Sequence, residues 1–289
     1  MTQNNPKLGI LLMIVTTFIF AAQDGISAYL ATKYNVYLVV MIRYWFFALF
    51  VLSIAQFYQG GIRKVAHSEQ TWIQFFRGAL LVLEIMVTVL AFVYLGLVEA
   101  HALFTIYPLM IAALSGPVLG EKVGWRRWLA IGVGFVGILV ILRPGYGVFS
   151  PYALIPIAGA LMFALYGLIT RYVARKDTAA TSFFWTGIGG AVTATIIGLF
   201  FLEPLAQEDW GWMALLCVTG IAGHFTLIKC YEVVEAGTVQ PFAYFQLVFA
   251  VAIGVTLFDE TLPLTTAIGA AIVVSAGIFT LLRSARKGR

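Results

Sequence analysis

Long apolar stretches alternate with short polar connections along the whole chain. Each stretch holds about 20 residues, which is the length that a helix needs to cross the hydrocarbon of a bilayer. The predicted spans are residues 8–31, 36–58, 72–95, 98–119, 125–142, 152–173, 180–202, 210–233, 238–258 and 263–282. Because the connections leave no room for a soluble domain, the pattern predicts an all-α integral membrane protein with ten transmembrane helices.

The pattern is written twice. At an offset of 139 residues, Leu119-Gly120-Glu121 aligns with Phe258-Asp259-Glu260, and at an offset of 143 residues Phe20-Ala21 aligns with Phe163-Ala164. Such self-similarity indicates two copies of one unit, here 1–145 and 146–289. Five spans per copy is an odd number, so the second copy enters the membrane from the opposite side. The sequence therefore predicts two inverted five-helix repeats around a central cavity, which is typical of secondary transporters that work by alternating access.

Composition supports the membrane assignment. Of the 289 residues, 61% are apolar and 11% are charged, and the mean hydropathy is +0.95. That apolar content exceeds what one soluble core can hold. The polar N-terminus lacks the basic region of a signal peptide, so 8–31 is expected to be retained as a span. Cys217 and Cys230 lie about 20 Å apart on one predicted helix, too far for a disulfide. The sequence predicts no metal site and no cofactor.

The net charge of +5 is distributed in a way that indicates orientation in a membrane, not nucleic-acid binding. One side of the predicted bilayer carries Lys7, Arg63, Lys64, Lys122, Arg126, Arg127, Arg171, Arg175, Lys176, Arg283, Arg286, Lys287 and Arg289. The other side carries Lys33 and Arg143. Because basic residues favour cytoplasmic loops, both termini are predicted to be cytoplasmic, in a multi-pass protein of the inner membrane.

Five charged side chains inside the predicted spans stand out, because an isolated charge in hydrocarbon costs at least ~2.5 kcal/mol. Arg77 lies near a span end, which favours a snorkelling structural anchor. Asp24 is interpreted as a structural ion partner of Arg43. Glu84 lies near mid-span, and two interpretations remain equal: a site for a substrate amine or a proton, and a structural partner for Arg43 or Lys229.

The eighth span carries the fifth of these charged side chains, Lys229, and two further polar groups, Glu232 and His224. Lys229 precedes Glu232 by three residues, a spacing that favours a local ion pair. Because Lys229 lies deeper in the span than Glu232, it is also the candidate that would hold a substrate carboxylate. For His224, a role in packing or in the cavity wall is favoured over a role as a proton relay.

The repeat supplies an independent filter, because a site on a pseudo-two-fold axis is lined by equivalent positions of both copies. The polar or aromatic matches are His101 with Gln240, Thr105 with Tyr244, Tyr107 with Gln246, and Gln23 with Tyr166. The first, fourth, sixth and ninth spans, with the third and eighth, are therefore expected to surround the cavity. The candidate substrate-binding residues are Gln23, Glu84, His101, Thr105, Tyr166, His224, Lys229, Gln240 and Tyr244. Pro108 and Pro156 are expected to let their helices bend.

Two segments carry a resemblance to a known family. Val118-Leu119-Gly120-Glu121 closes one apolar helix, Thr256-Leu257-Phe258-Asp259-Glu260 closes its counterpart, and a glycine-spaced helix follows each. In these features the chain resembles the drug/metabolite transporter superfamily, specifically its ten-helix members with two EamA domains. The resemblance implies that the terminal Glu caps and orients helices and does not line the path. Asp259 stands where the family usually has Gly, on a surface turn.

Within that superfamily the chain is most similar to the aromatic amino acid exporters of the YddG type. This similarity implies outward movement of phenylalanine, tyrosine or tryptophan across the inner membrane. The four-helix multidrug members have a proton-coupling Glu in their first helix. Here the first helix offers Asp24, nearer to one end, so proton coupling does not carry over.

The leading hypothesis is a secondary transporter that exports a small amphipathic metabolite. Glu84 and Lys229 would offer opposite charges to a zwitterion, while Tyr166 and Tyr244 contact its apolar body. Amino acids, nucleosides and cationic drugs fit the same residues, in either direction. An intramembrane enzyme is the alternative from another class, although the chain has no H-E-x-x-H motif; a channel would need a filter-like run, which is absent. The expected partners are the substrate and the lipid bilayer, with the chain working as a monomer.

Overall fold

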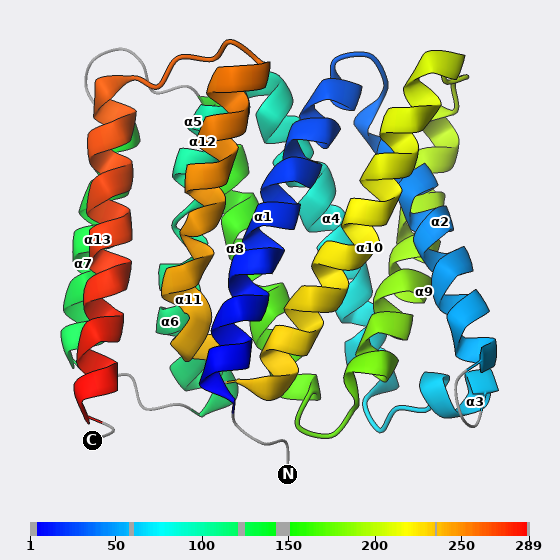
Figure 1. The fold of residues 1–289 in the computed structure, drawn as a ribbon, viewed down its shortest axis with the longest axis horizontal. Coiled ribbons are helices and arrows are strands. Elements are labelled where there is room, and N and C mark those ends of the chain that lie inside the picture. Colours follow the sequence, from blue (N-terminus) through cyan, green and yellow to red (C-terminus); the bar gives the residue numbers. More distant parts are fainter. Residues whose placement is uncertain (1–4, 58–60, 121–124, 143–150, 235, 288–289) are drawn as a thin grey trace.

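The protein is a bundle of helices that lie side by side (Figure 1). The computed structural model describes residues 5–57, 61–120, 125–142, 151–234 and 236–287. Its α-helices are α1 (Pro6–Ala31), α2 (Val36–Phe57), α3 (Gly61–Ala66), α4 (Thr71–Leu95), α5 (Leu97–Phe104), α6 (Tyr107–Leu119), α7 (Trp125–Leu142), α8 (Leu154–Val173), α9 (Ala179–Gly198), α10 (Trp210–Val233), α11 (Ala236–Ala243), α12 (Phe245–Leu257) and α13 (Leu264–Lys287). Three 3₁₀ turns are also present: η1 (Pro151–Ala153), η2 (Leu199–Phe201) and η3 (Gln207–Asp209).

The helices account for the predicted spans. Among the described residues, seven helical stretches are long and apolar enough to cross a membrane, and shorter apolar helices cover 131–141, 245–257 and 264–276. These ten segments correspond one to one with the ten predicted spans. The prediction of an all-α protein of ten spanning segments is confirmed. The short helix α3 is additional, and it lies at the foot of α2 (Figure 1).

The two halves run in opposite directions. Helix α1 begins and α13 ends at the same end of the bundle, where Lys7, Arg63 and Lys64 also lie (Figure 1); we call this the basic end, and the opposite one the far end. Helix α1 runs away from the basic end, whereas α8, five spans later, runs toward it. Near the end of α8, Arg175 donates a hydrogen bond to the carbonyl oxygen of Leu119 at the end of α6 (2.7 Å). This contact ties the two halves together at the basic end.

The fourth and ninth spans are each divided into two helices. The sequence predicted a bend at Pro108 in the fourth span but no interruption of the ninth. The first break is at Thr105 and Ile106, between α5 and α6, and the second is at Tyr244, between α11 and α12. Pro108 explains the first break, because it has no N–H to donate to the carbonyl of Phe104. Pro156, which was expected to bend its helix, instead lies in the first turn of α8, where a missing N–H leaves no bond unmade.

Helix α5, the first half of the broken fourth span, is capped by a residue of the other repeat. The two carboxylate oxygens of Glu260 accept hydrogen bonds from the backbone N–H groups of Leu97 and Val98, at 2.8 and 2.7 Å. The preceding residue, Gly96, has φ 77° and lies so close to Glu260 that a Cβ there would be 3.1 Å from its Oε1. A carboxylate at a helix N-terminus satisfies orphan N–H groups and the helix dipole together. Glu121, the counterpart in the first repeat, lies outside the described residues.

Helices α7 and α13, the last of each repeat, pack together at one edge of the bundle (Figure 1). Glycines permit this approach: a Cβ on Gly137 would lie 2.8 Å from the carbonyl oxygen of Gly269, and a Cβ on Gly269 would lie 2.6 Å from that of Gly137. Small residues let membrane helices approach where lipid removes the hydrophobic drive. Gly137 and Gly269 thus bring the last helices of the two repeats into direct contact.

At the far end, Asp209 joins the α1–α2 connection to the start of α10. Its buried carboxylate accepts hydrogen bonds from the Lys33 ammonium (2.9 Å) and from the Tyr34 hydroxyl (2.8 Å). Contacts with Tyr29 and with Asp209 raise the pKa of Lys33. Because one carboxylate holds both neighbours, the far end is closed between α1 and α10.

Candidate functional site

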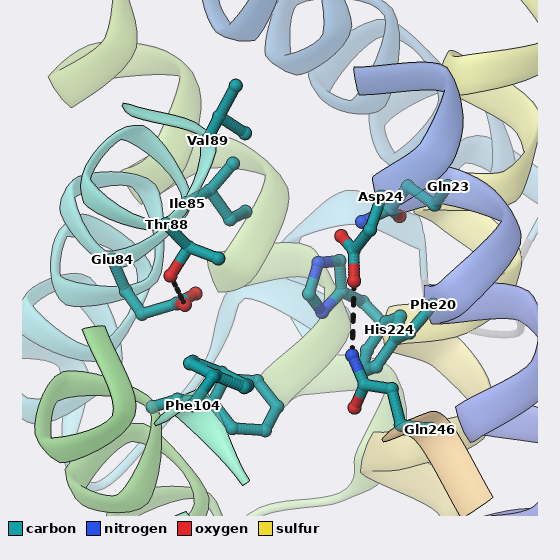
Figure 2. Close-up of a pocket in the computed structure, with 11 residues that line it drawn as sticks. Phe20, Gln23, Asp24, Glu84, Ile85, Thr88, Val89, Phe104, His224 and Gln246 are labelled. Atoms are coloured by element: carbon teal, nitrogen blue, oxygen red, sulfur yellow. Dashed lines mark hydrogen bonds between the residues drawn. The ribbon is translucent and has the colours of Figure 1, made fainter. Parts of the chain in front are cut away.

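A cavity lies between the two repeats, where α1 faces α4 (Figure 2). Its volume is about 380 Å³, including its open mouth. The walls are Phe20, Gln23 and Asp24 of α1; Glu84, Ile85, Thr88 and Val89 of α4; Phe104 of α5; Phe163 of α8; His224 of α10; and Gln246 of α12. These helices belong to the six spans that the sequence analysis expected to surround the cavity.

Glu84 is a buried carboxylate on the α4 wall. It is 3% exposed, and its Oε1 accepts a hydrogen bond from the Thr88 hydroxyl one turn further along (2.7 Å). No described cation forms an ion pair with it. Figure 2 shows this side chain facing Asp24 and His224 across the cavity. A buried carboxylate is costly unless a partner compensates its charge, so Glu84 is suited to a cationic ligand or a proton.

Asp24, on the opposite wall, is already compensated. Its Oδ2 accepts a hydrogen bond from the Gln246 amide (3.1 Å) and lies 3.1 Å from His101 Nε2. The other ring nitrogen of His101 lies 3.1 Å from the carbonyl oxygen of Leu97, which only accepts, so Nδ1 carries a proton. The ring of His101 is therefore the partner of the Asp24 carboxylate at Nε2. The expected pairing of Asp24 with Arg43 is wrong: its partner is His101.

Arg43 lies directly behind the cavity wall. It is 2% exposed, and its Nη2 donates to Gln23 Oε1 (3.0 Å) and lies 3.2 Å from His224 Nε2. Because a guanidinium only donates, His224 accepts at Nε2 and is neutral, with its proton on Nδ1. Gly220 makes room for this arrangement, since a Cβ there would lie 2.6 Å from Arg43 Nε. A cation therefore stands behind two cavity-lining residues.

Arg77 is not the snorkelling anchor that its position near a span end suggested. It is 0% exposed and donates to Gln74 Oε1 (3.0 Å), to the hydroxyls of Thr170 (3.2 Å) and Thr186 (2.7 Å), and to the carbonyl of Ser182. The Tyr166 hydroxyl lies 3.4 Å from Nη1, and the ring of Tyr166 lies 5.4 Å from the guanidinium carbon. These neutral acceptors join α4, α8 and α9. Tyr166 belongs to this network and does not line the cavity.

Lys229 also lies away from the cavity. Its side chain is 40% exposed, and Nζ forms an ion pair with Glu232 at 2.8 Å. The other carboxylate oxygen of Glu232 accepts from the backbone N–H of Ala179 (3.0 Å). The structure does not bring Lys229 together with Glu84, because Lys229 is not among the residues that line the central cavity. The local pair, the alternative drawn from the spacing, is observed.

A smaller pocket lies where the two helix breaks meet. Its walls are His101, Phe104, Thr105, Tyr107 and Pro108 of the first repeat, and Ala243, Tyr244, Gln246 and Leu247 of the second. The repeat alignment had paired Thr105 with Tyr244 and Tyr107 with Gln246, and the structure brings both pairs together here. Gln240 is not among these walls; its amide donates to the Tyr231 hydroxyl (3.3 Å).

Several cavity residues were missed as candidates. Asp24 was assigned a structural role, and Gln246 was noticed only as the repeat match of Tyr107. Phe20, Phe104 and Phe163 supply aromatic walls, and Phe20 lies 6.1 Å from Phe163 between ring centroids. A signal for two of them was present, because Phe20 and Phe163 are matched positions of the repeat. Two equivalent phenylalanines thus meet across the pseudo-symmetry axis.

Two inverted halves, broken helices and a cavity with polar and aromatic walls define the class of membrane transporters. Residues 7–143 and 150–282 match the EamA-like transporter family, and the chain belongs to that family. It is a multi-pass membrane transporter and not an enzyme, so the intramembrane-enzyme alternative is excluded.

Similarity to individual relatives extends over nearly the whole chain. An S-adenosylmethionine uptake transporter of Rickettsia prowazekii is 26% identical over 94% of this chain and 90% of its own. A riboflavin transporter of Vibrio cholerae is 27% identical over 99% and 97%, and a pseudopaline exporter of Pseudomonas aeruginosa is 23% identical over 94% and 95%. A solved protein structure with 18% identity covers 100% of both chains with a TM-score of 0.68, which supports the fold.

Proposed function

We propose that the protein is a secondary transporter whose central cavity binds a small metabolite that combines a flat ring with a positive charge. One observation carries this proposal: Glu84 is a carboxylate without a cationic partner among the described residues, and it faces a cavity with three phenylalanine walls. The cation of the substrate would compensate Glu84, while Phe20, Phe104 and Phe163 would contact the ring.

The relatives suggest the first compounds to test. S-adenosylmethionine has a sulfonium cation and an adenine ring, and both features suit this cavity. Riboflavin offers a flat ring without the cation. Aromatic amino acids, the substrates implied by the resemblance to exporters, are the second candidate, because their ring and ammonium group suit the phenylalanine walls and Glu84. Arg43 behind Gln23 then takes the place of Lys229 as the nearest cation for a carboxylate.

The same carboxylate supports a coupling mechanism. Glu84 is compensated either by a proton or by the substrate cation, and the two compete for one group. If the cavity opens to each face of the membrane in turn, the transporter exchanges a proton for a cationic substrate. The two helix breaks meet beside the cavity. At these breaks the angle between α5 and α6, and the angle between α11 and α12, can change during transport.

Orientation and organisation complete the proposal. The concentration of basic residues at the basic end supports a cytoplasmic position for both termini in the inner membrane. The boundary between the repeats lies between 145 and 146. A monomer suffices, because one chain supplies both halves of the cavity.

The test is counterflow in proteoliposomes that contain the full chain. Vesicles are loaded with one unlabelled compound from S-adenosylmethionine, riboflavin, phenylalanine, tyrosine and tryptophan, and the same compound is added outside as a labelled trace. The proposal expects accumulation of S-adenosylmethionine, competition by other ring-bearing cations and weak competition by acidic amino acids. Accumulation of phenylalanine alone would support the second candidate. Accumulation of riboflavin with no response to cations would contradict the role of Glu84 as a cation site.

A further inference from the structure

A second cavity lies outside the transport site, between α2, α9 and α10 in the half of the bundle toward the basic end. Its volume is about 840 Å³, including its open mouth. All of its lining side chains are apolar, among them Phe50, Ile54, Val65, Phe183, Ala222 and Phe225. Such a wall offers no hydrogen bond to a polar ligand, so the cavity fits a hydrocarbon chain.

The cavity is a wedge that opens toward the membrane. Helices α2 and α10 approach each other where Arg43 lies against Gly220, and they separate toward the basic end with α9 behind them (Figure 1). Ile54 on α2 and Phe225 on α10 line the cavity, yet they are 48% and 42% exposed. The opening therefore faces the acyl chains of the leaflet at the basic end.

Aromatic rings seal the inner end of the wedge from the transport site. The ring centroid of Phe183 lies 4.8 Å from that of Phe47 and 5.3 Å from that of Phe225. Phe47 in turn stacks on His224, at 6.4 Å between centroids. A substrate with a charge would find no polar partner on this route, which favours a lipid tail as the occupant.

Helix α3 places two positive charges beside the mouth of the wedge. Its Val65 is buried and lines the cavity, while the neighbouring Arg63 and Lys64 are exposed. The indole N–H of Trp185 donates to the carbonyl of Ala66 (3.0 Å), which fixes α3 against α9. Neither Arg63 nor Lys64 forms an ion pair with a carboxylate of the described ranges.

We infer that this wedge binds an anionic phospholipid, with one acyl chain between α2, α9 and α10 and the phosphate held by Arg63 and Lys64. Basic residues at a membrane surface attract anionic headgroups. The apolar cavity adds a place for one chain, which a general surface attraction does not. This site is independent of the substrate that the central cavity carries.

The test is native mass spectrometry of the purified full-length protein, titrated with phosphatidylglycerol or phosphatidylcholine of the same acyl chains. The wild type is expected to retain one phosphatidylglycerol in preference to phosphatidylcholine. Arg63→Gln with Lys64→Gln should lower that preference about fivefold for each charge removed. Lys7→Gln with Lys176→Gln removes two exposed charges elsewhere at the basic end and should leave the preference unchanged.

A second pair of variants tests the tail. Ala222→Phe fills the wedge and should abolish retention of both lipids; Ala180→Leu, on α9, serves the same purpose if the first variant does not fold. Equal retention of phosphatidylglycerol by the wild type and all variants would overturn the inference. Unchanged lipid retention by Ala222→Phe, with transport lost, would overturn it in favour of a lateral substrate route.

Discussion

Two buried arginines, Arg77 and Arg43, have opposite surroundings. Each of the five N–H groups of Arg77 has an acceptor: Nε donates to Gln74, Nη1 to Tyr166 and Thr170, and Nη2 to Ser182 and Thr186.

Arg43 has fewer hydrogen-bond partners than Arg77. Its Nη2 reaches Gln23 and His224, but its buried Nε has no partner among the described residues, and both neighbours border a cavity. A buried charge whose donors are all used holds helices together. Arg43 keeps one unused donor and stands behind two residues that line the cavity. The same contrast separates Asp24, which is paired with His101, from Glu84, which has no cationic partner among the described residues.

The largest effect is expected from the removal of Arg77, the arginine whose donors are all used. Arg77→Met leaves acceptors on three helices without a donor, at about 1–3 kcal/mol for each buried group left unsatisfied, so we expect the largest loss of stability of the set. Thermal unfolding in detergent measures the loss. Arg77→Lys should recover little, because an ammonium lacks the planar fork, and Lys176→Gln serves as an exposed control. A wild-type unfolding temperature for Arg77→Met would contradict the structural role.

The next effect tests the unsatisfied carboxylate. Glu84→Gln keeps the shape and the bond with Thr88 but removes the charge, so we expect transport of a cationic substrate to fall roughly 10- to 150-fold, the equivalent of one charge-assisted hydrogen bond. Folding should be retained, and the dependence of the transport rate on pH should weaken because the competing proton has lost its site. The measurement is counterflow from pH 5 to 9. Undiminished transport by the folded variant would remove Glu84 from the site.

A smaller effect is expected where Gly220 accommodates Arg43. Gly220→Ala places a Cβ 2.6 Å from Nε, so the guanidinium must shift away from Gln23 and His224. Crowding of this kind costs about 1–3 kcal/mol. We expect a reduced unfolding temperature together with impaired transport. Gly132→Ala is the matched control, because a Cβ there meets nothing within 4 Å.

The smallest effect is expected at Lys229, which lies outside the central cavity. Lys229→Gln breaks a half-exposed pair with Glu232, which contributes less than about 1 kcal/mol. Transport and unfolding temperature should both match the wild type. A loss of transport comparable to that of Glu84→Gln would return Lys229 to the substrate path.

The sequence predicted the spans, their duplication and the helices around the cavity, because hydropathy and repeats record these directly. It predicted a bend at Pro108, close to the break at Thr105, but not the break at Tyr244, because the apolar pattern does not record where backbone hydrogen bonds are interrupted. The partners of Arg77 also escaped prediction: hydroxyl and carbonyl oxygens carry no charge pattern that singles them out.

Lys229 was placed at the cavity for a different reason, and the cavity walls do not include it. Depth along a span was read as closeness to the centre, but depth does not say which side of a helix faces inward. Asp24 was assigned to Arg43 because charges of opposite sign were matched first. The structure pairs Asp24 with a histidine of another span, and His101 is a partner that only the spatial arrangement of α1 and α5 reveals.

The cap on α5 has a consequence for biosynthesis. Glu260 follows Leu97 by 163 residues, and the two meet only when the second repeat is in place. As the chain leaves the ribosome, the first repeat enters the membrane with the start of α5 still uncapped, and it waits for nearly the rest of translation before the carboxylate arrives. A ribosome that stops before residue 260 would therefore release a chain with an open end inside its first repeat, a form that cellular quality control could distinguish from the finished protein.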